Sequence, residues 1–347
     1  MATQAKQTSS PEVLDAAWLR ELCLEHGADD VGFVSVDDPS MAEERPQALD
    51  VMPGTKTLVA IVRRMNRDNI RSRARSIGNA EIFNTGHDID ETADAVVKAL
   101  DAQGIRAANP SMAFPMDMSR YTAPRFWGIQ HKTVAVAAGL GHMGIHRNVI
   151  HPRFGNFIIL ATILTEARVD EYSKPIDYNP CLGCNLCVAV CPVGAIKVDA
   201  EFDFLACYQH NYRQHMTGFR EWIQRVVDSD DADDYPERFG EAETAAMYQN
   251  LASKPIDYLS GYCLSVCPAG EDVIGPFLHD RKQHVREVVK PLQQREEVVY
   301  VSEGSSAEAH VRKRFPKKRP SYVTNAPRPD FDLVGPQSTP PAPEDAE

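Results

Sequence analysis

Hydrophobic residues in the first half of the chain follow helical and strand-like patterns in turn. Apolar positions recur at helical spacing over 13–26, which predicts an amphipathic helix that ends at Gly27. Compact apolar runs elsewhere are typical of buried strands. The further elements predicted are strands over 31–36, 57–62 and 156–164, a short strand at 105–108, a largely helical stretch over 82–100 and a small apolar segment at 132–138.

This mixture predicts an α+β protein, with an α/β domain at its N-terminal end. A cysteine-rich region follows, and it is interrupted by an insert with helical patches and an acidic loop, Asp228 to Asp234. The last stretch is rich in proline and acid, which favours disorder. The predicted boundaries are 11–168 for the α/β domain, 169–275 for the cysteine-rich domain, about 210–255 for its insert, 276–320 for a C-terminal segment and 321–347 for the tail.

Composition and charge narrow the class of protein. The formal net charge is −12, which we take as an argument against a nucleic-acid partner. One basic run at 312–319 opposes this average, and its simplest interpretation is a solvated flank. No apolar run approaches the roughly 18 residues of a membrane helix, and the N-terminus lacks the features of a secretory signal. We therefore expect a cytoplasmic protein.

Eight cysteines are present, and seven of them fall between 181 and 267. In a reducing compartment such clustering favours metal ligation over disulfides. Cys23 lies apart from the others and is predicted to be a core thiol.

The strongest signal in the sequence is C-x2-C-x2-C-x3-C-P, the spacing of bacterial ferredoxins. Three thiolates two residues apart can wrap one corner of an iron–sulfur cubane, and Gly183 lets the backbone curl around it. The fourth cysteine then points toward a second cluster, and Pro192 turns the chain away. The motif consists of Cys181, Cys184, Cys187 and Cys191.

A second C-x3-C-P motif, Cys263 to Pro268, is the counterpart expected in a two-cluster ferredoxin. In the crossed arrangement of two-cluster ferredoxins, the first cluster takes Cys267 in addition to the first three cysteines. The second takes Cys191 and Cys263, with Cys207 as third ligand. A zinc site does not explain this combination of spacings.

The fourth ligand of the second cluster is missing, because Ser260 and Asp257 stand where a complete motif has cysteines. Three alternatives follow. One of these two residues ligates through oxygen, or the cluster has three irons or an open corner, or the cluster is labile or absent. We favour an occupied site with a non-cysteine or open corner.

A glycine motif, G-x-G-x-x-G at 139–144, precedes the cysteines. A dinucleotide-binding interpretation needs a helix after the motif, and Pro152 would end such a helix after about two turns. We consider that interpretation a minor alternative.

The string from Gly139 to Thr165 resembles the segment before the cluster domain of epoxyqueuosine reductases, and corrinoid reductive dehalogenases have a more distant version. The order of the cysteine motifs matches too, with the lone Cys207 between them. The resemblance covers roughly 130–275. It implies a nitroreductase-like N-terminal fold that holds cobalamin, with the clusters of a ferredoxin-like domain beside it as an electron relay.

The resemblance also implies site residues. The corrinoid would be lined by Gly139, Gly141, His142, Gly144, His146 and Gly155. Epoxyqueuosine reductases carry an acidic proton donor upstream, where this chain has Arg125. Other donors nearby are Asp117 and Tyr121, and the pair Arg120 and Tyr121 fits the tyrosine with a basic neighbour that dehalogenases use.

The sequence thus predicts a cytoplasmic iron–sulfur reductase with two 4Fe-4S clusters, and the resemblance adds cobalamin as a candidate cofactor. Single electrons would pass from a donor such as ferredoxin or flavodoxin to a small organic substrate. On the net charge, tRNA is expected to be an unlikely partner, and no membrane is involved. The alternative is a ferredoxin-like electron carrier without catalytic chemistry of its own. Against it stands the large N-terminal domain.

Overall fold

A four-stranded antiparallel sheet is the centre of the first half of the chain. It consists of β2 (Asp30–Ser35), β3 (Thr57–Arg64), β7 (Ile158–Thr165) and β4 (Ala107–Ala108), in this spatial order. In β3, Ala60 is paired with Gly32 on one side and with Thr162 on the other. The computed structural model describes residues 12–113, 115, 128–198, 201–213, 218–252, 259 and 261–323.

Both faces of this sheet are buried, which explains why its central strands are apolar without interruption. Along β3, Leu58, Ala60 and Val62 join the core on one face, while Val59 and Ile61 join the core on the other. Side chains of a strand alternate between its faces, so a strand covered on both sides has no polar face. The predicted strands at 57–62 and 156–164 are confirmed with small shifts in their ends.

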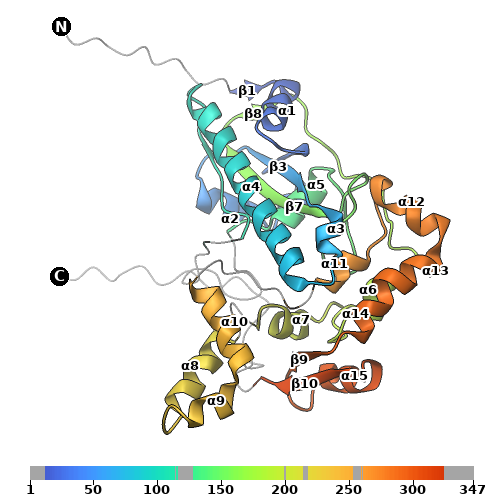
Figure 1. The fold of residues 1–347 in the computed structure, drawn as a ribbon. Coiled ribbons are helices and arrows are strands. Elements are labelled where there is room, and N and C mark those ends of the chain that lie inside the picture. Colours follow the sequence, from blue (N-terminus) through green and yellow to red (C-terminus); the bar gives the residue numbers. More distant parts are fainter. Residues whose placement is uncertain are drawn as a thin grey trace, which may run out of the picture.

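Helices cover the two faces of the sheet (Figure 1). α1 (Ala16–Glu25) and α4 (Arg75–Asp101) pack on one face, and α2 (Arg45–Val51) and α5 (His131–Ala137) pack on the other. Cys23 of α1 is fully buried in the core, as predicted. Burial raises the pKa of this thiol to about 12.

Helix α4 begins seven residues before the helical stretch predicted from hydrophobic periodicity. Its first two turns carry no apolar stripe, and Ile77 there is exposed. Tertiary contacts hold this end instead, because Arg75 donates to Glu297 at 2.7 Å. In Figure 1 the helix runs along the sheet and its N-terminal end reaches the cysteine-rich half.

No helix follows the glycine motif. β5 (His142–Met143) pairs with β6 (Val149–Ile150) in an antiparallel hairpin, and His151 and Gly155 form a further bridge. The dinucleotide-binding alternative is therefore excluded, since it needs a helix N-terminus at this place.

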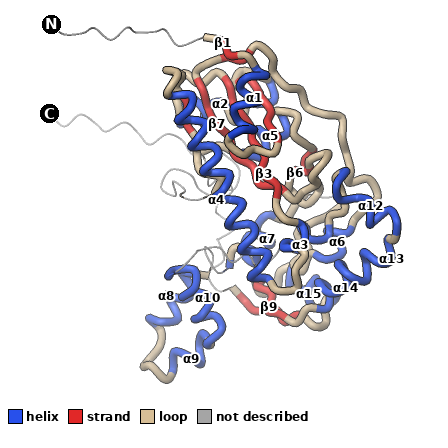
Figure 2. The backbone as a smooth tube through the Cα atoms, turned by 45° about the horizontal axis from the view of Figure 1, so that its top comes forward, coloured by secondary structure: helices blue, strands red, loops and turns tan. Residues whose placement is uncertain are grey.

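The second half is mainly helical, with one small parallel pair of strands, and its hydrophobic core includes Cys187 and Cys191. Figure 2 shows its helices gathered beside the sheet domain. Its elements are α6 (Leu186–Val190), α7 (Phe204–Asn211), α11 (Tyr262–Val266), α12 (Glu271–His279), α13 (Arg281–His284), the π-helical η3 (Val285–Val289), α14 (Lys290–Gln294), β9 (Glu297–Val301), α15 (Ser306–Arg314) and β10 (Lys318–Tyr322). Short elements of the first half are β1 (Val13–Leu14), η1 (Pro39–Met41), α3 (Arg67–Ile70) and β8 (Arg168–Val169).

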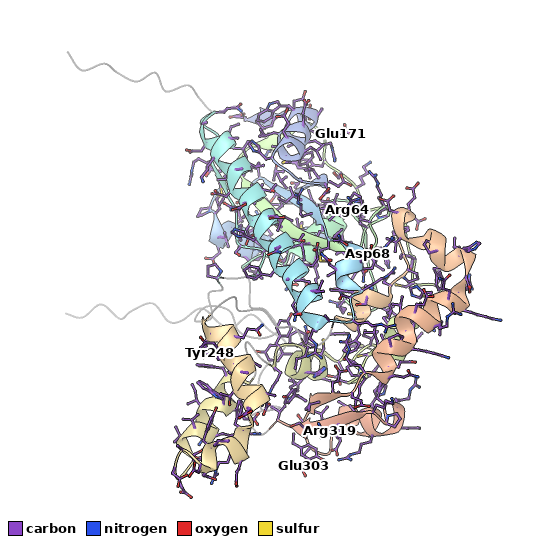
Figure 3. All side chains as sticks on the ribbon, in the orientation of Figure 1. Arg64, Asp68, Glu171, Tyr248, Glu303 and Arg319 are labelled. Atoms are coloured by element: carbon purple, nitrogen blue, oxygen red, sulfur yellow. The ribbon has the colours of Figure 1, made fainter. Side chains whose placement is uncertain are left out.

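The insert forms a helical lobe that stands out from the rest in both views (Figures 1 and 2). It contains α8 (Phe219–Val227), α9 (Asp234–Phe239) and α10 (Glu241–Ala252), which agrees with the predicted helical patches. Tyr248 on α10 is exposed on this lobe (Figure 3).

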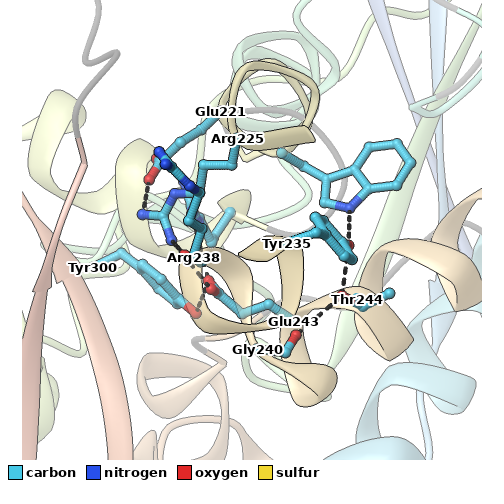
Figure 4. A network of polar contacts seen from close by, with 10 residues as sticks. Glu221, Arg225, Tyr235, Arg238, Gly240, Glu243, Thr244 and Tyr300 are labelled. Atoms are coloured by element: carbon cyan, nitrogen blue, oxygen red, sulfur yellow. Dashed lines mark hydrogen bonds and ion pairs between the residues drawn. The ribbon is translucent and has the colours of Figure 1, made fainter. Parts of the chain in front are cut away.

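A buried polar network attaches the lobe to β9 (Figure 4). Arg213 is almost completely buried and donates to Glu221 at 2.5 Å. Glu243 accepts from Arg213 at 3.4 Å and from the Tyr300 hydroxyl at 2.6 Å. The guanidinium also lies over the Tyr300 ring, 4.5 Å from its centroid. These contacts compensate the desolvation of the buried charges.

The C-terminal part departs from the sequence expectations at two places. Five of the six basic side chains at 312–319 are exposed, as expected of a solvated flank. Lys318 is the exception, because it is buried and its ammonium donates to the Leu292 carbonyl at 2.8 Å and to the Glu297 carboxylate. β10 reaches Tyr322, and Val323 is buried, so the fold extends into the segment expected to be a tail. Residues 324–347 lie outside the described part.

The mixed helix and sheet architecture agrees with the predicted α+β class. Among the described residues, no helix combines the length and the apolar character that crossing a bilayer demands.

Candidate iron–sulfur centres

Two short helices with the same local structure carry the cysteine motifs. Each begins after a residue in the left-handed region, Asn185 with φ 53° before α6 and Gly261 with φ 89° before α11. In each, one cysteine follows in the first turn and another, Cys191 or Cys267, is the C-cap. A five-residue helix with a cysteine at each end separates its two thiols along the axis. One helix can therefore contribute to two different groups of thiols.

The first group lines a hollow that is partly open to solvent. Three of its cysteines come from the turn before α6 and from α6 itself, and the fourth comes from the end of α11. Gly183, in that turn, has a φ of 70° and lies in open space, as a tightly curled loop requires. The group consists of Cys181, Cys184, Cys187 and Cys267, with Ile145, His146 and Ile150 also lining the hollow.

The second group contains Cys191, Cys207 and Cys263, whose charges influence one another. Cys207 lies on α7. The backbone N–H of Ala195 donates to the Cys191 sulfur at 3.3 Å, and the side-chain amide of Asn148 donates to the Cys263 sulfur at 3.7 Å. Ser260 and Asp257, the candidates for the fourth position, lie outside the described residues.

Burial determines the acidity of these thiols. It raises the pKa of Cys267 to about 12 and that of Cys263 to about 11, and Cys191 raises the latter further. Burial also raises the pKa of Cys187 and of Cys207, and neighbouring cysteines add to the effect. Thiolates gathered in a desolvated place repel one another unless a cation neutralises them. The donor set therefore fits iron, because a bound iron cation favours the thiolate form that burial alone disfavours.

Among the described residues, no three His, Cys, Asp or Glu side chains are close enough together to hold a single metal ion.

The residues predicted to line a corrinoid have packing roles. Gly155 has a φ of 65°, and a Cβ there would lie 2.1 Å from the Ala269 carbonyl oxygen. A Cβ at Gly139 would lie 2.4 Å from the Lys174 carbonyl oxygen. At Gly141 and Gly144 a Cβ would meet atoms of Ile150 and His146, respectively. The chain's own atoms fill the space that a Cβ would take at each of these glycines, so close packing by itself accounts for glycine there.

The histidines near this segment differ in their surroundings. His131 bonds with the Thr162 hydroxyl at 2.9 Å, and His151 bonds with Asp30 at 2.9 Å. His146 lines the first hollow, and burial lowers its pKa to about 4, so it is neutral. His142 lies in β5 and is half-buried. Asp117 and Tyr121 lie outside the described residues.

Three polar residues near the second group were not predicted. Lys132 donates to Asn148, and Asn156 donates to the Cys263 carbonyl at 3.2 Å. No spacing rule signals them, because α5 and the β5–β6 hairpin meet α11 only in the folded chain.

A family model described as "4Fe-4S binding domain" matches residues 174–197, which contain the first motif. The chain thus contains a ferredoxin-type iron–sulfur domain, and the sequence prediction of iron–sulfur binding is confirmed to this extent.

Within this class, the chain is similar to epoxyqueuosine reductases, and the predicted resemblance is confirmed. The protein of Lactococcus garvieae (strain Lg2) is 32% identical over 97 residues, 27% of this chain and 27% of that protein. The protein of Gloeobacter violaceus (strain ATCC 29082 / PCC 7421) is 26% identical over 163 residues, 46% and 47% of the two chains. The chain therefore spans less than half of these curated relatives.

Solved structures of the same kind are also similar. The epoxyqueuosine reductase of Streptococcus thermophilus matches with a TM-score of 0.42 and 14% identity, over 79% of this chain and 75% of that one. The catabolic reductive dehalogenase NpRdhA matches with a TM-score of 0.44 and 17% identity, over 71% and 36% of the two chains.

The expectation that tRNA is an unlikely partner was wrong. The curated relatives are named epoxyqueuosine reductases, and one similar structure is an epoxyqueuosine reductase with an epoxyqueuosine-modified tRNA stem loop (TM-score 0.43, 16% identity, 87% of this chain and 81% of that one). Net charge sums over the whole surface, whereas recognition depends on the local field at one site. A total of −12 therefore does not exclude such a partner.

Proposed function

We propose that the chain is an iron–sulfur reductase that carries single electrons through two 4Fe-4S clusters to a substrate on its α/β domain. The grouping of the cysteines carries this proposal. The last cysteine of each short helix joins thiols supplied by the other motif, as the crossed arrangement of a two-cluster ferredoxin requires. Cys181, Cys184, Cys187 and Cys267 would hold the first cluster.

The second cluster would be held by Cys191, Cys207, Cys263 and one further ligand. A 4Fe-4S cluster, when bound, takes up and releases one electron at a time. The residues around it restrict water and donate N–H groups to sulfur, as Ala195 does to Cys191 at 3.3 Å. Such bonds favour the more negative, reduced state.

A substrate that accepts electrons is a further part of the proposal. The relatives support an organic group, carried by a small molecule or by tRNA. Cobalamin dependence rests on the resemblance to epoxyqueuosine reductases and reductive dehalogenases. A cytoplasmic location and a ferredoxin or flavodoxin as electron donor remain predictions from the sequence.

Anaerobic reconstitution with iron and sulfide tests the clusters. We expect about seven to eight irons per chain, as two ligand sets require, and electron paramagnetic resonance signals from two centres. Cys184→Ala should reduce the count to about four or fewer, because three thiolates hold the first cluster poorly. Four irons in the wild type would reduce the proposal to one cluster, and an unchanged count in the variant would refute the ligand assignment.

Turnover is tested separately, with dithionite as reductant and cobalamin added. An epoxyqueuosine-modified tRNA stem loop is the first substrate to try, and organohalides are the second. If the reconstituted protein passes electrons to ferredoxin but converts neither substrate, the electron-carrier alternative is favoured.

A further inference from the structure

Asn148 bridges a lysine and a cysteine of the second group. Its side-chain oxygen accepts from the Lys132 ammonium at 2.9 Å, and its side-chain nitrogen donates to the Cys263 sulfur at 3.7 Å. Lys132 lies on α5, Asn148 follows the β5–β6 turn and Cys263 lies on α11. Three separate elements thus converge on one thiol.

The orientation of the amide follows from hydrogen-bond chemistry. An ammonium group can only donate, so the atom of Asn148 that faces Lys132 must be the oxygen. The NH2 group then faces Cys263. Lys132 also donates to the Arg147 carbonyl at 2.8 Å, which holds its nitrogen beside the turn. The lysine therefore selects the orientation in which Asn148 is a donor to sulfur.

The backbone of the turn is fixed as well. Arg147 has a φ of 62°, and its N–H donates to the Gly144 carbonyl at 2.8 Å. The Gly144 N–H donates to the Asn148 carbonyl at 2.9 Å, and the Asn148 N–H donates to the His146 ring at 3.2 Å. A residue other than glycine in the left-handed region is strained unless its surroundings hold it. Here the strained residue places Asn148 beside the thiol.

We propose that Asn148 donates an N–H···S bond to the Cys263 thiolate and thereby raises the reduction potential of the second cluster, with Lys132 as the positioning residue for the amide. This inference rests on the proposed function, since it needs a cluster bound to Cys263. Reduction adds one electron to the cluster and makes its ligand sulfurs more negative. A donor to such a sulfur stabilises the reduced form more than the oxidised form.

Redox titration of the reconstituted protein tests this inference. Dithionite supplies the electrons, and electron paramagnetic resonance follows both centres. Asn148→Leu has similar size and no donor, and Asn148→Asp puts a carboxylate beside the sulfur. We expect Asn148→Leu to lower the reduction potential of the second cluster. At a fixed applied potential, the ratio of oxidised to reduced second cluster should rise on the order of tenfold, which corresponds to about 59 mV for a one-electron couple. Asn148→Asp should shift the potential further in the same direction.

Lys132→Met should shift the potential in the same direction as Asn148→Leu. The double variant should shift it by less than the sum of the two single shifts, because Lys132 positions the amide in addition to acting on Cys263 through its charge. Additive shifts would overturn the positioning role. Lys98→Met removes an equal charge from the exposed end of α4 and should leave both potentials unchanged. The first centre serves as an internal reference in every variant.

The outcomes separate this inference from the proposed function. A wild-type protein with only the first centre would overturn this inference and reduce the proposed function to one cluster. Two centres in the wild type and an unchanged second potential in Asn148→Leu would overturn the role of Asn148 alone. If the leucine variant does not fold, Asn148→Ser replaces it, because the shorter side chain does not reach the sulfur, and the same shift is expected.

Discussion

Arg71, at the end of α3, donates to the carbonyl oxygen of Cys267 at 3.2 Å and so connects the sheet domain to the last cysteine of the second motif. The same guanidinium donates to the Ser265 carbonyl at 2.9 Å and lies over the Phe157 ring. Burial lowers the pKa of Arg71 to about 10, which leaves it charged at neutral pH. One side chain thus holds the end of α11 against Phe157, the residue before β7.

Arg71→Met should therefore loosen the end of α11 where Cys267 lies. Hydrogen bonds from a charged group contribute about 1.5 to 3 kcal/mol, so we expect a loss of that order in the free energy of unfolding. Chelator-induced iron release from the first group should also become faster. Urea unfolding and iron release under anaerobic conditions measure the two effects.

Arg45→Met is the matched control, because Arg45 forms an exposed ion pair with Asp37. Such pairs contribute little to stability. Equal behaviour of the two variants would show that the Arg71 contacts do not hold Cys267.

Gly155→Ala tests whether this glycine serves packing. An added Cβ would meet the Ala269 carbonyl, and the φ of 65° disfavours any side chain. We expect destabilisation by about 2 kcal/mol or more, measured by thermal or urea unfolding. Gly275→Ala, in open space on α12, should instead be neutral or stabilise by up to about 1 kcal/mol. Wild-type stability in Gly155→Ala with altered cobalamin binding would favour the cofactor role over the packing role.

Ser260→Cys addresses the missing ligand of the second cluster. Thiolate is a softer and better iron ligand than a hydroxyl, so a cysteine at this position should complete a four-thiolate site. We expect a longer lifetime of the second cluster in air and a shifted potential, both followed by electron paramagnetic resonance. Asp257→Cys is the parallel variant. A wild-type lifetime and potential in Ser260→Cys would place the fourth ligand elsewhere.

His210 should make stability depend on pH. Burial lowers its pKa from 6.5 to about 3, with Arg75 and Lys318 adding to the effect, and its ring accepts from the Tyr300 N–H at 3.3 Å. Between these two values the unfolded chain binds one proton more than the folded chain, so stability falls as the pH falls through this window. The contribution is up to about 1.4 kcal/mol per pH unit.

His210→Gln should remove that part of the pH dependence. The measurement is urea unfolding of wild type and variant at several pH values between 6.5 and 5, compared as differences so that acid effects on the clusters cancel. His87→Gln, which removes an exposed imidazole, should retain the wild-type slope. Parallel pH profiles of wild type and His210→Gln would contradict the assignment.

Much of the fold and of the site could be read from short-range pattern. The strand at 57–62 was predictable because a strand buried on both faces leaves an uninterrupted apolar run. The cysteine motif was predictable because its spacing determines a local turn and a short helix, whatever surrounds them. The first two turns of α4 were not predictable from local pattern, because Arg75 is held there by Glu297, 222 residues later in the chain.

By itself, the sequence determined the number and spacing of the thiols, and with them the kind of cofactor. The tertiary structure decided what surrounds each thiol: Arg71 at the Cys267 carbonyl, and Asn148 at the Cys263 sulfur with Lys132 behind it. The physical reason is the distance along the chain over which each interaction acts. A spacing of two or three residues constrains only the local backbone, whereas a hydrogen bond between distant residues exists only after the sheet domain and the cysteine helices have packed together.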